Sequence, residues 1–161
     1  MTGIIHEPSV IIDEDNLNLH DEGRIDAFCY VNCTGAVEIG AKSVIHCGSH
    51  IVGRGGLTIG DRSVITYNCV LVTSAPRMDG PMSSLVDKSE INQRVGRITI
   101  GDEVFIGSGT VIMPDVTLHD AAVIAAGAYV DKDVPPATVL MPNGSLHERP
   151  GDWSHVFPSE K

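Results

Sequence analysis

The sequence predicts an all-β fold, a parallel β-helix in which short strands stack coil upon coil. The main observation is a run of aliphatic residues at every sixth position: Ile100, Ile106, Ile112, Leu118, Ile124 and Val130. Six is neither the period of a helix nor that of a simple alternating strand. Gly101, Gly107 and Ala125 follow three of these positions, where a small residue leaves room for a sharp backbone turn. Hexapeptide repeats of this kind bury their apolar corners by stacking on the next coil.

The N-terminal half continues the same pattern with interruptions. Residues 1–18 show no clear repeat, and we expect them to cap the first coil, although a frayed terminus would look the same. The repeat begins near Leu19 and runs to residue 72. It slips by two residues at Val37–Gly40 and at Leu57–Gly60, which we interpret as small corner bulges. With three hexapeptides in each coil, segments 19–72 and 98–134 predict roughly five coils.

Two segments lie outside the repeat. Residues 73–97 carry prolines and glycines but no six-residue spacing, and the repeat resumes at Ile98 and Ile100. This segment is therefore expected to be an excursion loop, the usual place for binding residues on a rigid scaffold. Pro135 and Pro136 end the regular coils, so residues 135–161 form a C-terminal tail. Its apolar residues pack either on the prism wall or on a neighbouring subunit: Trp153, Val156 and Phe157.

Composition narrows the class of protein. The 161 residues are a single-domain length, with 42% hydrophobic residues and only 4% aromatic ones. The net charge of −10 argues against nucleic acid and anionic lipid as partners. We expect no membrane span and no signal peptide, and hence a cytoplasmic protein. The cysteines are then expected to be free thiols, with no metal site: Cys29, Cys33, Cys47 and Cys69.

One stretch resembles a known family. The run IGDEVFIGSGTVIMPDVTLHDAAVIAAGAYVDKDVPP resembles the C-terminal coils of the hexapeptide-repeat acyltransferases, in particular the galactoside, maltose and polysaccharide O-acetyltransferases. The resemblance covers about residues 37–143. It implies a left-handed parallel β-helix, a homotrimer with active sites between subunits, acetyl-CoA as donor, and a saccharide acceptor held near the excursion loop.

Acetyl transfer to a hydroxyl needs a general base and donors for the developing oxyanion. The family usually carries its base in a motif like T-G-H-P, but the matching stretch Thr73–Pro76 has Ala75 at the histidine position. We therefore predict His46 as the base, since it follows Ile45 where other coils have glycine. The alternative for His46 is a solvated surface histidine. His50 and His119 are weaker candidates.

Further site residues follow from the resemblance. Asn68 matches the asparagine of a pattern like I-A-P-N and is expected to orient the acceptor, unless it is simply a turn asparagine. Ser108 matches the serine of I-G-S, Ala126 the small residue lining the pantetheine groove, and Lys132 the lysine of T-K-D near the phosphates of coenzyme A. Within the loop, Arg77 and Asp79 are the expected saccharide contacts.

The sequence therefore predicts an acetyl-CoA-dependent O-acetyltransferase acting on a sugar or polysaccharide-precursor hydroxyl, with His46 as the general base. One alternative is a catalytically degenerate β-helix that serves as a scaffold or binding module. It is supported by Ala75 and by the segment Pro142–Leu146, which lacks the basic residue of the family's G-N-P-A-K. The other is a carbonic-anhydrase-like zinc site, but His46, His50 and His119 lack that family's spacing.

Overall fold

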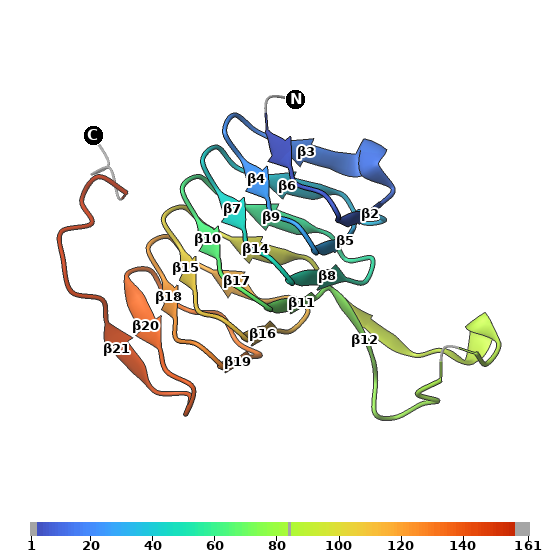
Figure 1. The fold of residues 1–161 in the computed structure, drawn as a ribbon. Helices are drawn as coiled ribbons and strands as arrows, with labels where there is room; N and C mark the ends of the chain where they lie inside the picture. Colours follow the sequence, from blue (N-terminus) through green and yellow to red (C-terminus); the bar gives the residue numbers. More distant parts are fainter. Residues whose placement is uncertain (1–2, 84, 157–161) are drawn as a thin grey trace, which may run out of the picture.

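The computed structural model describes residues 3–83 and 85–156, and in this part the chain winds as a triangular prism with three sheets (Figure 1). Face A contains β1 (Ile4–Ile5), β4 (Arg24–Ile25), β7 (Val44–Ile45), β10 (Val64–Ile65), β15 (Phe105–Ile106), β18 (Val123–Ile124), β20 (Thr138–Leu140) and β21 (Leu146–Glu148). Face B contains β2 (Val10–Ile12), β5 (Tyr30–Asn32), β8 (His50–Val52), β11 (Val70–Val72), β16 (Val111–Ile112) and β19 (Tyr129–Val130). Face C contains β3 (Leu17–Leu19), β6 (Val37–Ile39), β9 (Leu57–Ile59), β14 (Ile98–Ile100) and β17 (Thr117–Leu118).

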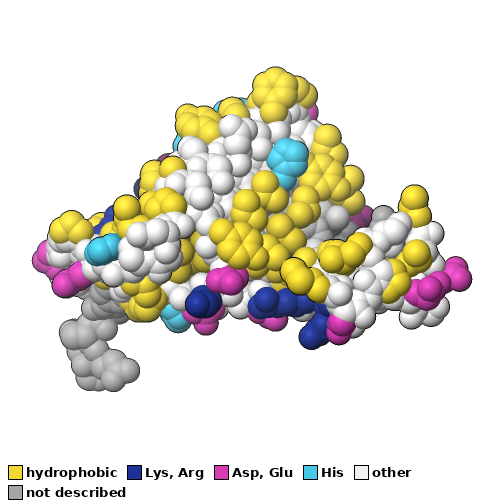
Figure 2. Space-filling model, turned by 90° about the horizontal axis from the view of Figure 1, so that it is seen from below, with side chains coloured by type: hydrophobic (Ala, Val, Ile, Leu, Met, Phe, Trp, Pro, Cys, Tyr) yellow, Lys and Arg dark blue, Asp and Glu magenta, His cyan; other side chains and the backbone are white. Residues whose placement is uncertain are grey.

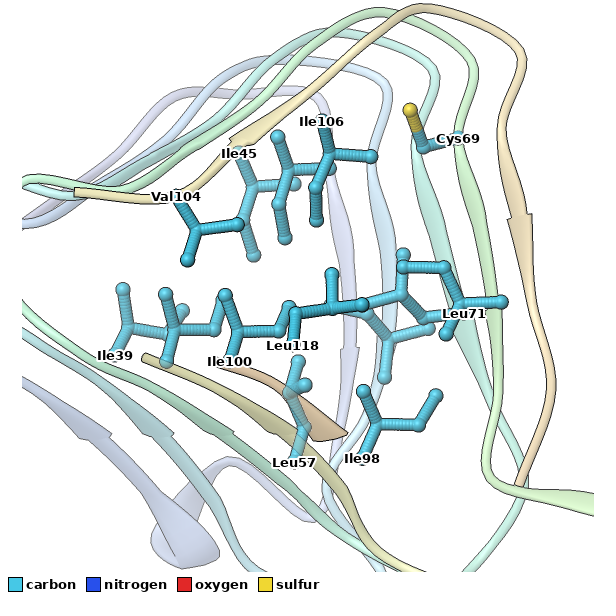
Figure 3. Packing of buried hydrophobic residues seen from close by; sticks show 14 of the residues in the cluster. Ile39, Ile45, Leu57, Cys69, Leu71, Ile98, Ile100, Val104, Ile106 and Leu118 are labelled. Carbon is cyan, nitrogen blue, oxygen red and sulfur yellow. The ribbon is translucent and has the colours of Figure 1, made fainter. Parts of the chain in front are cut away.

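The six-residue repeat forms the core of this prism. Each repeat supplies one short strand and the corner after it. Apart from β21, the strands of each face pair in parallel from coil to coil. The aliphatic residue of each repeat points inward, so that like residues stack along the axis (Figure 3). Ile45, Ile51 and Ile106 are almost completely buried. A parallel β-helix of about the predicted number of coils is thereby confirmed.

The first coils are longer than three hexapeptides. Arg24 pairs with Val44, and Val44 pairs with Val64, so these coils are 20 residues long. Later, Phe105 pairs with Val123, 18 residues on. The two extra residues lie in the corner between faces B and C, at 33–36 and 53–56. The slips in the repeat thus arise just before the predicted positions, because the corner absorbs the additional residues ahead of each face C strand.

The N-terminal segment differs from the expected cap. β1, β2 and β3 pair in parallel with β4, β5 and β6, so residues 4–19 already form a complete coil. Its inward positions are Ile5, Ile11 and Leu17, which keep the six-residue spacing. The polar run at its corner contains the 3-10 turn η1 (Glu14–Asn16) and masks this spacing in the sequence.

The excursion leaves the prism at the corner between faces B and C as a two-stranded arm (Figure 1). β12 (Ser74–Pro76) pairs antiparallel with β13 (Gln93–Val95), and the 3-10 turn η2 (Lys88–Glu90) lies between them. At its root, the amide of Gly96 donates to the carbonyl of Thr73 over 3.0 Å. Gly55 lies beneath, where an added Cβ would sit 2.3 Å from the Gly96 carbonyl oxygen. The segment expected to be an irregular loop therefore has an ordered root.

The C-terminal region extends the prism beyond Val134. β20 pairs in parallel with β18, and β21 folds back on β20 in antiparallel fashion. The tail then docks on the same subunit, because Arg149 Nη1 donates to the carbonyls of Glu103 and Ala121 over 3.0 and 2.9 Å. The Arg149 guanidinium lies 3.4 Å from the ring centroid of Trp153. Phe157, expected in the same apolar group, lies outside the described residues. Among the described residues, no helix is long and apolar enough to cross a membrane.

Candidate active site

The candidate site is built on the corner between faces A and B. Asp26, His46 and Thr66 each follow the last residue of a face A strand, on three consecutive coils. The amide of Asp26 donates to the carbonyl of Ile45, and the amide of His46 donates to that of Ile65, both over 2.8 Å. Because the preceding isoleucine points into the core, the next side chain points outward. The coil register therefore places these three side chains in one column.

His46 is held on two sides. Its Nδ1 lies 2.7 Å from Oδ2 of Asp26, and its ring stacks on that of Tyr67 with centroids 4.9 Å apart and an interplanar angle of 21°. Donation from Nδ1 to the carboxylate assigns the proton to that nitrogen and leaves Nε2 as an acceptor. The His46 side chain is 21% exposed, so the ring is partly open to solvent while its orientation is fixed. This is the arrangement required of an oriented general base.

Asp26 is surrounded by basic groups. His6 Nδ1 lies 3.2 Å from Oδ1, and Arg24 Nε forms an ion pair with the same oxygen at 2.8 Å. Burial by itself raises the pKa of the Asp26 carboxyl. The hydrogen bond from His46, the charges of Arg24 and His46, and the hydrogen bond from His6 outweigh burial, so the pKa of Asp26 lies below its ordinary value. Asp26 is therefore an ionised carboxylate at neutral pH.

Sequence reasoning missed Asp26, His6 and Tyr67. The signal for Asp26 was the coil length, since it precedes His46 by 20 residues, and His6 precedes Asp26 by the same distance. Two slips of two residues already imply coils of this length. Tyr67 follows Thr66 and reaches back one coil to His46. Nothing in the sequence alone indicates that the Tyr67 side chain points toward the preceding coil.

Three other predicted residues lie on the same corner. Asn68 occupies the turn one coil beyond His46, with φ of 57°, and its Oδ1 lies 2.2 Å from where a Cβ on Gly48 would be. Ser108 lies on the next coil, and its hydroxyl donates to Oγ1 of Thr66 over 3.0 Å. Ala126 follows on the coil after that, where the amide of Gly127 donates to the carbonyl of Ser108. His46, Asn68, Ser108 and Ala126 thus form one line along the prism.

The remaining predicted residues lie elsewhere within one subunit. Arg77 and Asp79 are exposed on the arm, which starts at the corner between faces B and C. There, Asn92 donates from Nδ2 to Oδ1 of Asp79 over 2.9 Å. Lys132 follows β19 at the same B–C corner and lines a hollow with Leu140 and Leu146.

The other histidine candidates are also separate. His50 is exposed on face B, where its ring lies 6.2 Å from that of Tyr30. His119 follows β17 at the corner between faces C and A. Within one subunit, His46, His50 and His119 therefore occupy three different parts of the prism.

Comparison with known proteins supports an acyltransferase family. The family profile described as bacterial transferase hexapeptide (six repeats) matches residues 97–132. The chain is 35% identical over 128 residues to dTDP-4-amino-4,6-dideoxy-D-glucose acyltransferase of Escherichia coli, covering 78% of this chain and 67% of that protein. It is 37% identical over 135 residues to galactoside O-acetyltransferase of Escherichia coli strain K12, covering 80% of this chain and 61% of that protein.

The fold also matches solved structures. AntD, an N-acyltransferase from Bacillus cereus in complex with dTDP and 3-hydroxybutyryl-CoA, superposes with a TM-score of 0.86 at 18% identity, covering 97% of this chain and 83% of that one. At this identity the likeness concerns the fold alone. Together, the stacked parallel coils, the family profile and the 35% identical relative show that this chain belongs to the hexapeptide-repeat acyltransferases, with their left-handed parallel β-helix.

Proposed function

We propose that this protein transfers an acetyl group from acetyl-CoA to a hydroxyl of a sugar or polysaccharide precursor, with His46 as the general base. The observation that carries the proposal is the contact of 2.7 Å between His46 and Asp26, on the corner that also bears Asn68 and Ser108. A solvated surface histidine would not need a partly buried carboxylate partner and a stacked ring. The galactoside O-acetyltransferase relative supports the same reaction class.

The geometry suggests how the reaction proceeds. The acceptor hydroxyl gives its proton to Nε2 of His46, and its oxygen bonds to the thioester carbonyl carbon. The tetrahedral intermediate then collapses with breakage of the carbon–sulfur bond, and the imidazolium returns the proton to the leaving thiolate. Asp26 acts as a positioning residue, because it fixes the tautomer and stabilises the charged imidazolium. Asn68 would orient the acceptor, while Ser108 and Ala126 would line the path of the pantetheine arm.

The working form is proposed to be a trimer of this chain. The outward side chains of faces A and B are largely apolar and include Phe105, which is 41% exposed, and Tyr129, which is 59% exposed. The outward side chains of face C are polar: Asn18, Glu38, Thr58, Thr99 and Thr117. Covering faces A and B with neighbouring copies would allow the arm of one subunit, with Arg77 and Asp79, to approach the His46 corner of another.

A second candidate acceptor is an amino sugar. It is favoured by the 35% identity to an acyltransferase named for dTDP-4-amino-4,6-dideoxy-D-glucose. A neutral amine is a better nucleophile than a hydroxyl and depends less on a base. The paired His46 therefore favours the hydroxyl as acceptor. We also propose a cytoplasmic location, which the four free cysteines support.

The proposal is tested by an acceptor screen. Purified protein is incubated with acetyl-CoA and either free sugars, nucleotide-linked sugars or their 4-amino counterparts, and the products are identified by mass spectrometry. O-acetylation of a sugar that requires His46 is the expected result. Acylation restricted to amino sugars would favour the second candidate. A folded protein that acylates neither group would support the scaffold alternative.

A further inference from the structure

Cations without a carboxylate partner gather at one corner of this acidic protein. Among the arginines and lysines whose side chains are described, Arg24 and Arg62 pair with Asp26 and Glu103 at 2.8 and 2.6 Å. Lys42 and Arg94 lie 3.9 Å from carboxylates, and Arg149 is held by backbone carbonyls. The remaining ones make no ion pair with the described residues: Arg54, Arg77, Arg97 and Lys132.

All four lie at the corner between faces B and C or on the arm that leaves it. Arg54 lies between β8 and β9, Arg97 lies between β13 and β14, and Lys132 follows β19. The parallel register of β8, β11, β16 and β19 stacks these connections along one edge. Figure 2 shows Lys and Arg side chains gathered along one edge of the molecule, with acidic side chains among them.

The chain segments that carry Arg54 and Arg97 are brought together by glycines at the root of the arm. An added Cβ on Gly55 would lie 2.3 Å from the carbonyl oxygen of Gly96, so the two chain segments touch directly beside both arginines. The Arg97 guanidinium folds over Gly56, where an added Cβ would meet Nη2 at 2.6 Å. Arg97 Nη1 donates to Oγ1 of Thr58 over 2.9 Å. The guanidinium is thereby oriented by a neutral partner, and its charge stays uncompensated.

Nearby carboxylates leave these two charges unpaired. Asp115 lies against Gly96 but faces Arg94, with 3.9 Å between Oδ2 and Nε. Asp133 accepts the amide of Thr117 through Oδ1 over 2.8 Å. In a chain of net charge −10, these two exposed arginines without carboxylate partners are available to bind an anion. Guanidinium groups suit phosphate because they bind it with two parallel hydrogen bonds.

We propose that Arg54 and Arg97 form a binding site for a diphosphate group. Lys132, further along the same edge, would contact a separate phosphate group of the same ligand. This inference rests on the proposed function, which supplies two ligands of this chemistry: acyl-CoA and a nucleotide-linked sugar. The family resemblance implies a phosphate contact for Lys132 alone. The arginines lie where the arm meets the coils, so they would hold the diphosphate beside the arm residues Arg77 and Asp79.

The test is calorimetric titration of the wild type and of Arg54→Gln, Arg97→Gln and the double variant. The probes are coenzyme A, dephospho-coenzyme A, dTDP and pantetheine. Each single variant should weaken binding of a diphosphate probe about tenfold, the effect of roughly one charged hydrogen bond, and the double variant more. Pantetheine, which has no diphosphate, should bind all variants equally. Arg62→Gln is the matched control, because Arg62 is already paired with Glu103 at a different corner.

The probes distinguish the source of the diphosphate. Loss confined to coenzyme A and dephospho-coenzyme A assigns the site to the acyl donor, and loss confined to dTDP assigns it to the acceptor. Unchanged affinity of folded variants for every probe would overturn the proposal, as would a wild type that binds no diphosphate at millimolar concentration. If the arginine variants lose affinity but no acceptor is acylated, the site stands and the proposed function fails. If acetyl transfer proceeds and is insensitive to substitution of both arginines, the proposed function stands and the diphosphate site fails.

Discussion

At the scale of single residues, the site depends on the charge of Asp26. His6, Arg24 and His46 all contact this carboxylate, whose side chain is only 13% exposed. The depressed pKa of Asp26 means that the folded state binds its proton less tightly than the unfolded state does. Its interactions therefore stabilise the fold above the ordinary pKa of an aspartate, and this contribution is lost as the pH falls through the lowered pKa.

Asp26→Asn tests both the structural and the chemical role of this charge. At pH 7 the variant should be less stable by about 1–3 kcal/mol, the usual loss for a charged hydrogen bond. The difference from the wild type should shrink below about pH 4, where the unfolded wild type binds a proton that the folded carboxylate does not yet bind. Urea unfolding of both proteins between pH 7 and pH 3 measures this difference in the free energy of unfolding. A stability difference that persists unchanged to pH 3 would contradict the assignment.

Asp26→Asn should also change the kinetics of acetyl transfer in a way that a purely structural role for Asp26 would not. With a saturating acceptor, kcat should fall at least about tenfold while KM for acetyl-CoA stays within about twofold, because Asp26 acts only through His46. The pH profile of kcat should also change, since the histidine loses its charged partner. Glu38→Gln, which removes a carboxylate paired with His20 on face C at 3.0 Å, is the matched control and should leave both parameters unchanged.

The sequence points to single residues more readily than to the contacts between them. His46 stood out because glycine follows the inward aliphatic residue at Gly40, Gly60, Gly101 and Gly107, a purely local signal. Three of these glycines follow face C strands, and the neighbouring coils carry Asp26 and Thr66 at the position of His46. Its pairing with Asp26 depends on the 20-residue length of the coil, and its stacking on Tyr67 depends on a side-chain direction. Both contacts are properties of the assembled coils, so they cannot be predicted from single repeats.

At the scale of elements, the arm is an addition to coils that close without it. The bond between Thr73 and Gly96 spans its root, and face C continues from β9 to β14 in register. The sequence predicts an excursion over residues 73–97, because the repeat resumes in phase at Ile98. It did not predict β12 and β13, since Ser74–Pro76 and Gln93–Val95 lack the apolar alternation by which strands are recognised.

Shortening the arm should separate folding from acceptor turnover. Replacing residues 75–94 by Asn-Gly, a favoured two-residue hairpin turn, joins Ser74 to Val95, which are already paired. The melting temperature should change by only a few degrees, because the stacked coils carry the core. Turnover with a sugar acceptor should fall by at least about tenfold through loss of positioning contacts. The affinity for coenzyme A should be retained, because Arg54 and Arg97 remain in the shortened chain. Full turnover by a shortened chain would exclude the arm from acceptor binding.

At the scale of the whole molecule, the charge and hydropathy of the three faces predict how copies assemble. Tyr129 on face B and Phe105 on face A are exposed, and both lie toward the C-terminal end, on the coils that follow the arm. Exposed apolar side chains on two faces of one molecule favour a closed ring of copies. The sequence showed only the inward residues of each repeat, so this surface pattern became visible after the faces were assigned.

Light scattering after gel filtration tests the assembly. The wild type should have a mass of about 51 kDa, three times the 17.1 kDa of one chain. Phe105→Glu places a charge on face A and should lower that mass, because burying an unpaired carboxylate opposes association. Thr58→Glu, on the polar face C, is the control and should remain at the wild-type mass. A monomeric wild type would contradict an active site shared between subunits.

The central claim is that His46 accepts the proton of the acceptor, and its most direct test is the initial rate of acetyl transfer by His46→Ala. With the acceptor found in the screen, kcat should fall by about 10²–10⁴-fold, the usual effect of removing a general base, while the melting temperature and coenzyme A affinity stay close to those of the wild type. A folded His46→Ala protein that retains the wild-type rate would contradict the assignment of the base.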